Sequence, residues 1–267
     1  MKIINKFLNF ITKFRSGREL LAKFLDFFNG NLHLSLKILN INSNILLDVN
    51  SGPEVRYRVT SAKREETTME WLKKLDKNKT LYDIGANVGC YSLIAAKEFN
   101  IQKIHAFEPF PINYSKCIQN VIKNNLSEKI SVYNFAIDSE NKIQTLFHTN
   151  QYEKIQSGSS GHQIGNPIDE TGNIFKSNFE FLINTYSIDN LQSISKIPSP
   201  DYIKIDVDGR ELEILKGAKE TLNSGKIKSI MIEVNLDQND IIELLSYYGF
   251  TVAVYGEHGN TIFERKV

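Results

Sequence analysis

The stretch Thr80-Leu81-Tyr82-Asp83-Ile84-Gly85-Ala86-Asn87-Val88-Gly89 decides the fold. Its first half is a short apolar run typical of a buried strand, and residues 88–99 continue in a helical pattern. Gly85 allows the tight turn between them and the close approach of a ligand. The following helix N-terminus offers free N–H groups and a partial positive charge. Together with Asp83, Asn87 and Gly89, the turn predicts a site for a carboxylate or phosphate.

Strands and helices alternate along the rest of the chain. Further strands are predicted at residues 103–107, 130–135, 202–206 and 229–234. Helices are predicted at residues 111–125, from about residue 211 to Leu222, and at 238–248. A hairpin of residues 250–255 and 261–265 closes the chain. This order predicts an α/β fold with a mostly parallel sheet covered on both faces and an antiparallel C-terminal hairpin.

Composition narrows the class of protein. The chain has 267 residues, of which 41% are hydrophobic, so it can bury a large core. Lys and Arg number 32 against 31 Asp and Glu, and this balance gives no electrostatic case for a nucleic-acid partner. Two cysteines cannot build a disulfide framework. Without an apolar run of about 18 residues or a signal peptide pattern, we expect a cytoplasmic protein.

Residues 1–64 form an expected extension that precedes the main domain at 65–267. Residues 1–28 show an amphipathic helical pattern, with a break expected at Ser16-Gly17. Its Phe-rich face beside a basic face fits either a helix docked on the body or a second subunit, or a peripheral contact with a membrane surface. Strands are then predicted at 33–38, 43–49 and 55–59, followed by a helix at 65–76.

The second motif, Phe107-Glu108-Pro109, ends the next strand. Glu108 lies 23 residues after Gly85, where an acid can accept hydrogen bonds from both ribose hydroxyls of a nucleoside ligand. Phe110 could pack on the face of a purine.

The third motif is Asp206-Val207-Asp208-Gly209-Arg210-Glu211, at the end of an apolar strand. Sites in open α/β sheets form at the carboxyl ends of the strands, so Asp206 should point into the site. Glu233, near the end of the following strand, should reach the same edge. Glu211 is equally explained as an acid at a helix N-terminus.

Residues 149–180 are rich in Ser, Gly, Asn and Gln and carry His162. A loop of this length is typically a lid or a binding loop, and we expect a mobile cover over the acceptor site. The segments at 143–148 and 181–185 alternate like an extra pair of strands.

These motifs resemble the FkbM family of S-adenosylmethionine-dependent methyltransferases. The resemblance covers about residues 65–255 and rests on four segments and a terminal strand: 83–89, 106–109, 134–137, 204–218 and 232–234. The family usually has Glu where this chain has Asp208. The resemblance implies a Rossmann-like class I methyltransferase sheet and the cofactor S-adenosylmethionine.

The resemblance also implies roles for individual residues. The loop from Asp83 to Gly89 would hold the methionyl end of the cofactor and Glu108 its ribose. Phe110 and the segment Ala136-Ile137-Asp138 would flank the adenine, and Asp206 would border the cofactor. Family members commonly O-methylate sugars or sugar-bearing natural products and occur among genes for surface polysaccharides.

Methyl transfer to a hydroxyl requires alignment of the acceptor and removal of its proton. Asp206, Asp208 and Glu233 could act as bases, and Asp206 and Asp208 could bind Mg²⁺ through oxygen. His162 is the candidate histidine base. A nucleotide-dependent oxidoreductase would require Gly-x-Gly-x-x-Gly, which this chain lacks. A non-catalytic module that binds glycan or membrane through residues 1–64, and a homo-oligomer, stay open.

Overall fold

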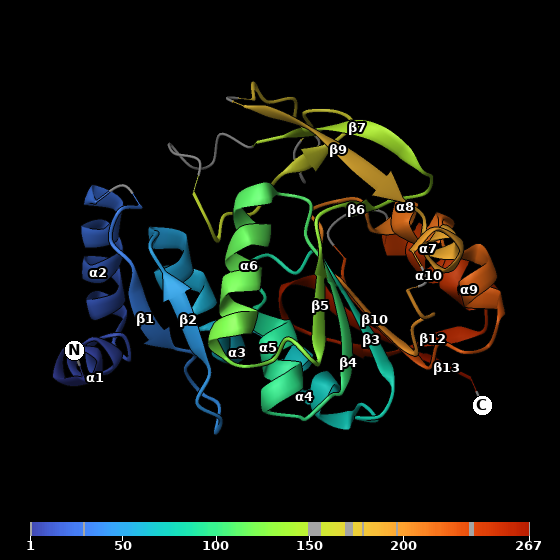
Figure 1. The fold of residues 1–267 in the computed structure, drawn as a ribbon. Helices are drawn as coiled ribbons and strands as arrows, with labels where there is room; N and C mark the ends of the chain where they lie inside the picture. The colour runs from blue at the N-terminus through green and yellow to red at the C-terminus, as the bar shows by residue number, and fades with distance from the viewer. Residues whose placement is uncertain are drawn as a thin grey trace.

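A central sheet of seven strands dominates the computed structural model, which describes residues 2–28, 30–148, 156–168, 173–177, 179–195, 197–234 and 238–266 (Figure 1). In sheet order the strands are β12 (Phe250–Tyr255), β13 (Asn260–Arg265), β11 (Ser229–Glu233), β10 (Tyr202–Ile205), β3 (Thr80–Ile84), β4 (Lys103–Phe107) and β5 (Ile130–Tyr133). Strands β11, β10, β3, β4 and β5 are parallel, and β13 and β12 add an antiparallel hairpin. The predicted sheet and its terminal hairpin are confirmed.

Helices cover both faces of this sheet. One face packs against α4 (Glu66–Lys74), α5 (Cys90–Lys97) and α6 (Pro111–Lys123). The other packs against α7 (Ile188–Ser195), α8 (Glu211–Lys216), α9 (Lys219–Asn223) and α10 (Gln238–Tyr247). Adjacent residues of β3 show the alternation, because Leu81 joins the first core and Tyr82 the second. Because helices cover both faces of the sheet, a ligand site is expected at the carboxyl ends of the strands.

A smaller sheet lies beside the carboxyl ends of the central strands (Figure 1). It contains β6 (Ala136–Ile137), β9 (Glu180–Tyr186), β7 (Lys142–Phe147) and β8 (Gln163–Ile164). Strands β7 and β9 pair antiparallel from Lys142–Thr185 to Phe147–Glu180. The strand pair predicted on the two sides of the long polar segment is therefore confirmed. Strand β8 lies within that polar segment and pairs antiparallel with β7.

The N-terminal extension contains α1 (Lys2–Ile11), α2 (Arg15–Phe27), β1 (Leu34–Lys37) and β2 (Leu46–Val49). Strands β1 and β2 pair antiparallel. The break between the helices falls before Arg15 and not at Ser16-Gly17. Gly17 lies inside α2, where a side chain would collide with the carbonyl group of Ile11, so the two helices meet there.

The strand predicted at 55–59 is wrong. Residues Glu54–Arg58 form a π-helical turn, η1, which leads into α3 (Ser61–Arg64). Val55 and Val59 are both fully buried, and their spacing of four residues places them on one side of a helical turn. The alternation was misleading, because a strand would place Tyr57 on the same side as both valines, whereas Tyr57 is exposed.

The helices of the described residues include none that is long and apolar enough to cross a membrane.

Candidate functional site

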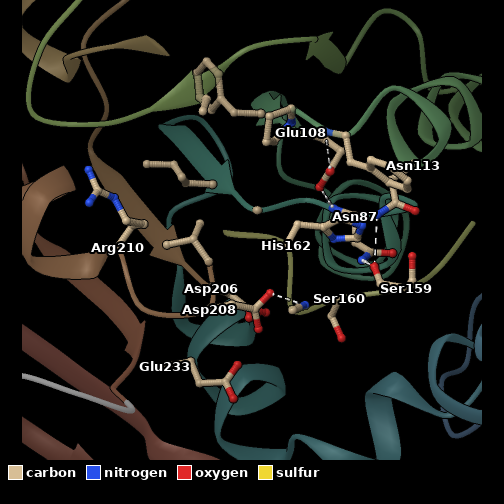
Figure 2. Close-up of a pocket in the computed structure, with 18 of the residues that line it drawn as sticks. Asn87, Glu108, Asn113, Ser159, Ser160, His162, Asp206, Asp208, Arg210 and Glu233 are labelled. Atoms are coloured by element: carbon tan, nitrogen blue, oxygen red, sulfur yellow. Dashed lines mark hydrogen bonds between the residues drawn. The ribbon is translucent and has the colours of Figure 1, made fainter. Parts of the chain in front are cut away.

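A cavity of about 290 Å³ opens at the carboxyl ends of β3, β4 and β10 (Figure 2). The chain continues from β3 to β4 on one side, while β10 lies on the other. The order of strands therefore reverses next to β3, which is where open α/β sheets bind ligands. The lining includes seven of the residues expected to hold a cofactor: Gly85, Asn87, Glu108, Phe110, Ala136, Ile137 and Asp206.

The turn after β3 brings the backbone close to the cavity. Gly85 has a φ of +82°, and a Cβ atom there would collide with the carbonyl oxygen of Asp206. Both observations require glycine. Asn87 also has a positive φ, of 51°, and its Oδ1 accepts a hydrogen bond from the N–H of Val88 at 2.9 Å. The Asn87 side chain thus stabilises the conformation of the turn.

Glu108 lines the cavity at the end of β4, with 6% of its surface exposed. Its Oε2 accepts the Asn87 N–H at 2.7 Å, and its Oε1 accepts the Phe110 N–H at 3.0 Å. Burial raises the pKa of this carboxyl to about 7, although the backbone hydrogen bonds act in the opposite direction. The two backbone donors fix the carboxyl at the position where a ligand's hydroxyl groups could reach it.

Phe110 is fully buried, and the His162 ring lies 4.1 Å from its centre. The Nε2 of His162 is 3.0 Å from the Nδ1 of His148. Burial, with smaller effects from the His148 and Arg58 charges, lowers the pKa of His162 to about 3. His162 is therefore neutral at physiological pH.

Asp206 follows β10 and belongs to a network of buried charges. Its Oδ2 lies 2.7 Å from the ammonium group of Lys204, which is 3.9 Å from Asp83. Burial opposes ionisation, yet Lys204 and a hydrogen bond with Glu233 lower the pKa of Asp206 to about 2. Burial and the Asp206 charge raise the pKa of Glu233 to about 10. Asp206 is ionised and Glu233 carries the proton, so the pair bears one negative charge.

Asp208 binds the polar segment instead of standing free. Its Oδ2 accepts the Gly161 N–H at 2.7 Å, and its carbonyl accepts a hydrogen bond from Gln163. The carbonyl of Ser159 accepts hydrogen bonds from the amides of Asn87 and Asn113 (Figure 2). Residues 156–164 are therefore anchored beside the cavity, which differs from the loose cover expected for the whole loop. Residues 149–155 and 169–172 lie outside the described residues.

The extension contributes residues that sequence reasoning missed. Tyr57, Arg58 and Arg64 of the extension line the cavity, as does Glu65, the first residue of the main domain. Arg58 donates two hydrogen bonds to the Gly158 carbonyl, at 3.1 and 2.9 Å. The alternation Val-Arg-Tyr-Arg-Val was visible in the sequence but suggested a strand. Nothing local indicated that this segment reaches the site.

Two other lining residues were also unexpected, Arg210 and His258. Arg210 lies within the third motif, and its guanidinium donates to both carboxylate oxygens of Asp138, at 2.8 and 2.7 Å. His258 lies in the turn between β12 and β13, η2 (Glu257–Gly259), and has a φ of 55°.

Two expected cofactor residues do not line the cavity, Asp83 and Gly89. Asp83 is buried below the turn and accepts a hydrogen bond from the Ser92 hydroxyl at 2.6 Å. At Gly89 an added Cβ would lie 2.7 Å from the Cys117 sulfur, so this glycine serves helix packing. Among the described residues, no three His, Cys, Asp or Glu side chains are grouped as a metal site would require.

The family model described as the methyltransferase FkbM domain matches residues 83–252. The hexuronic acid methyltransferase AglP of Haloferax volcanii is 25% identical over 224 residues, covering 80% of this chain and 84% of that protein. The 31-O-demethyl-FK506 methyltransferase FkbM of Streptomyces tacrolimicus is 22% identical over 202 residues, covering 67% of this chain and 75% of that protein.

Among solved structures, a methyltransferase FkbM from Methylobacillus flagellatus aligns with a TM-score of 0.48 and 18% identity. The alignment covers 72% of this chain and 44% of that one, so this chain spans less than half of that protein's length.

Proposed function

This chain belongs to the FkbM family of methyltransferases, which use S-adenosylmethionine, and we propose that it methylates a hydroxyl group of a saccharide or of a sugar-bearing natural product. The observation that supports the proposal is that one cavity is lined by two groups of residues. Gly85 and Glu108 could hold a nucleoside, and the ionised Asp206 lies beside protonated Glu233.

The residues at the Gly85 side of the cavity fit the cofactor. Glu108 would accept hydrogen bonds from the ribose hydroxyls, because its carboxyl is buried and already oriented by two N–H groups. Gly85 lets the backbone approach the ligand, and Ile137 supplies an apolar wall for the base. Phe110 could present its ring to the adenine once His162 moves away. When bound, S-adenosylmethionine supplies an electrophilic methyl group on a sulfonium.

Asp206 is placed to orient the acceptor. Its carboxylate would accept a hydrogen bond from the acceptor hydroxyl and turn an oxygen lone pair toward the methyl group. As the O–CH₃ bond forms and the S–CH₃ bond breaks, the oxygen becomes positively charged and its proton strongly acidic. Even a carboxylate with a pKa of about 2 can then take that proton.

The other candidate groups suit this step less well. The His162 ring lies against Phe110 and its Nε2 is 3.0 Å from the Nδ1 of His148, so it is less available to the acceptor than Asp206. Asp208 already accepts a hydrogen bond from Gly161. An Mg²⁺ ion would compete with Lys204 for the Asp206 oxygen at 2.7 Å. A metal-independent reaction therefore fits these contacts better.

An acidic sugar is the acceptor class that the cavity favours. Arg58 and Arg64 line the cavity from the extension, and guanidinium groups pair well with carboxylates. The name of the relative from Haloferax volcanii, a hexuronic acid methyltransferase, points the same way. We therefore expect the acceptor to carry a uronic acid.

The test is transfer of a labelled methyl group from S-adenosylmethionine to a panel of saccharides and nucleotide sugars. Product from uronic acids with little from the matching neutral hexoses would support the acidic class, and Arg64→Gln should narrow that difference. Equal use of both would remove the acidic preference. A chain that binds the cofactor but modifies no saccharide would contradict the acceptor proposal. Tight NAD binding would instead favour an oxidoreductase.

A further inference from the structure

Helices α1 and α2 expose aromatic side chains that the fold leaves uncovered. Between residues 6 and 28, the apolar residues with at least 48% of their surface exposed are Phe7, Phe10, Phe14, Leu20, Phe24 and Phe27. Both helices lie at the outer edge of the molecule, away from the central sheet (Figure 1). A surface of this kind on a globular protein marks an interaction site.

Packing within the fold does not account for this face. The inner side of α2 buries Leu21 and Leu25 in the main core, which already explains why the helix is docked. Leu20, Phe24 and Phe27 are spaced by four and three residues and form a second apolar stripe on the outer side. A helix that only covers the body requires one apolar side, and α2 has two.

Basic residues flank the exposed rings, while the acids of α2 are turned away. Lys6, Lys13, Arg15 and Lys23 are exposed, and none of the ion pairs within the described part of the chain involves them. Glu19 and Asp26, in contrast, both pair with Arg56 of η1, at 3.1 and 3.4 Å. The outer face is therefore aromatic and positively charged.

We propose that this aromatic and basic face of α1 and α2 docks the protein on an anionic phospholipid surface. Phe rings would enter the boundary between headgroups and acyl chains, and the Lys and Arg side chains would pair with lipid phosphates. A second copy of this chain fits less well, because the same face would bring its own positive charges together. The α2 helix also packs against η1, which carries Arg58, so docking would fix the cavity relative to the membrane.

Cosedimentation of the full chain with vesicles tests the proposal. We expect binding to phosphatidylcholine vesicles that contain about 30% phosphatidylglycerol, weak binding to pure phosphatidylcholine, and loss of binding as salt rises. The double variant Phe24→Ser, Phe27→Ser should weaken binding by about tenfold or more. The double variant Lys13→Glu, Arg15→Glu should do the same without altering any apolar residue.

Matched control variants distinguish binding through this face from nonspecific binding to vesicles. Tyr247 is as exposed as Phe27, at 82%, so Tyr247→Ser should leave vesicle binding unchanged. The pair Lys74→Glu, Lys77→Glu controls for charge. Retained cofactor binding, measured by calorimetry, would confirm that each variant is folded.

Three outcomes would overturn the proposal. The first is that the unmodified chain does not bind vesicles. The second is that the two double variants of the face bind as well as the control variants. The third is that the chain is a dimer in sedimentation velocity and that Phe24→Ser, Phe27→Ser converts it to a monomer. The last result would assign the face to self-association.

Discussion

The two ends of the cavity are built differently. The end that we propose binds the cofactor, called the cofactor end, is formed by Gly85, Asn87, Glu108 and Phe110 and comes from two turns that directly follow β3 and β4. The end that we propose binds the acceptor, called the acceptor end, is formed by Arg64, Glu65, Asp206, Glu233 and His258 and comes from four separate parts of the chain.

The ends also differ in how charge is controlled. At the cofactor end Glu108 is held by backbone N–H groups and has a pKa near 7. At the acceptor end Asp206 is held ionised by Lys204, and its charge keeps Glu233 protonated. Glu108 is therefore controlled by the turns beside it, while the charge state of Asp206 and Glu233 depends on two strands meeting at the cavity.

The largest effect is expected at Asp206. Asp206→Asn should lower turnover per folded molecule by about 10²–10⁴, because the variant can no longer take the acceptor proton. It should also lower the free energy of unfolding by about 1–3 kcal/mol, because Lys204 loses its ion pair at 2.7 Å and keeps the longer contact with Asp83 at 3.9 Å. Cofactor affinity should change little. Single-turnover kinetics corrected for the folded fraction, calorimetry and denaturant unfolding measure the three quantities.

Glu233→Gln is the matched variant, because it alters the same pair and leaves the Lys204 contact in place. A rate per folded molecule in Asp206→Asn within about threefold of the original would assign Asp206 to stability alone.

Substitution of Glu108 should give the next largest effect, which we expect on affinity for the cofactor and not on affinity for the acceptor. Glu108→Ala should weaken binding of S-adenosylmethionine by about 2–4 kcal/mol, as two charge-assisted hydrogen bonds to ribose are lost. Calorimetry measures it. Glu98→Ala is the control, since Glu98 also accepts backbone hydrogen bonds, from Asn42 and Ser43, but does not line the cavity. Unchanged affinity in Glu108→Ala would remove the ribose assignment.

Cofactor affinity should also depend on pH. The free Glu108 carboxyl has a pKa of about 7, and only its ionised form accepts both ribose hydroxyls. Protonation therefore competes with binding below that pH. The dissociation constant of S-adenosylhomocysteine should rise about tenfold between pH 8 and pH 6. The dependence should vanish in Glu108→Gln; if it persists there, another group causes it.

The smallest effect is expected at His162. The His162 ring lies against Phe110 and its Nε2 contacts His148, so in our proposal it does not take the acceptor proton, and His162→Asn should change turnover by less than about threefold. A loss of about hundredfold or more, with cofactor affinity retained, would move the base from Asp206 to His162.

Much of the fold could be predicted because its signals are local. The alternation of short apolar runs with helical patterns located the strands of the central sheet and the terminal hairpin. The structure of the N-terminal extension was harder to predict. Val55 and Val59 fit a strand and a helical turn equally well over five residues, and only their burial on one side of η1 distinguishes the two.

The cofactor end was likewise predictable in outline. Glu108 and Gly85 were found from their positions after strands, and both line the cavity. Gly89 and Asp83 were included because they belong to the same motif, yet they pack beneath it. A motif indicates where a turn lies, but not which of its residues face the ligand.

The sequence by itself determined the order of strands and helices, the turn at Gly85 and the acids that end β4 and β10. These follow from local spacing and backbone preference. Only the tertiary structure decided that Arg58 and Arg64 reach the cavity, that Asp208 binds the polar segment, and that Asp206 is ionised while Glu233 holds a proton. The reason is physical: a pKa depends on burial and on charges that folding brings close, and Glu233 lies far from Asp206 in the chain.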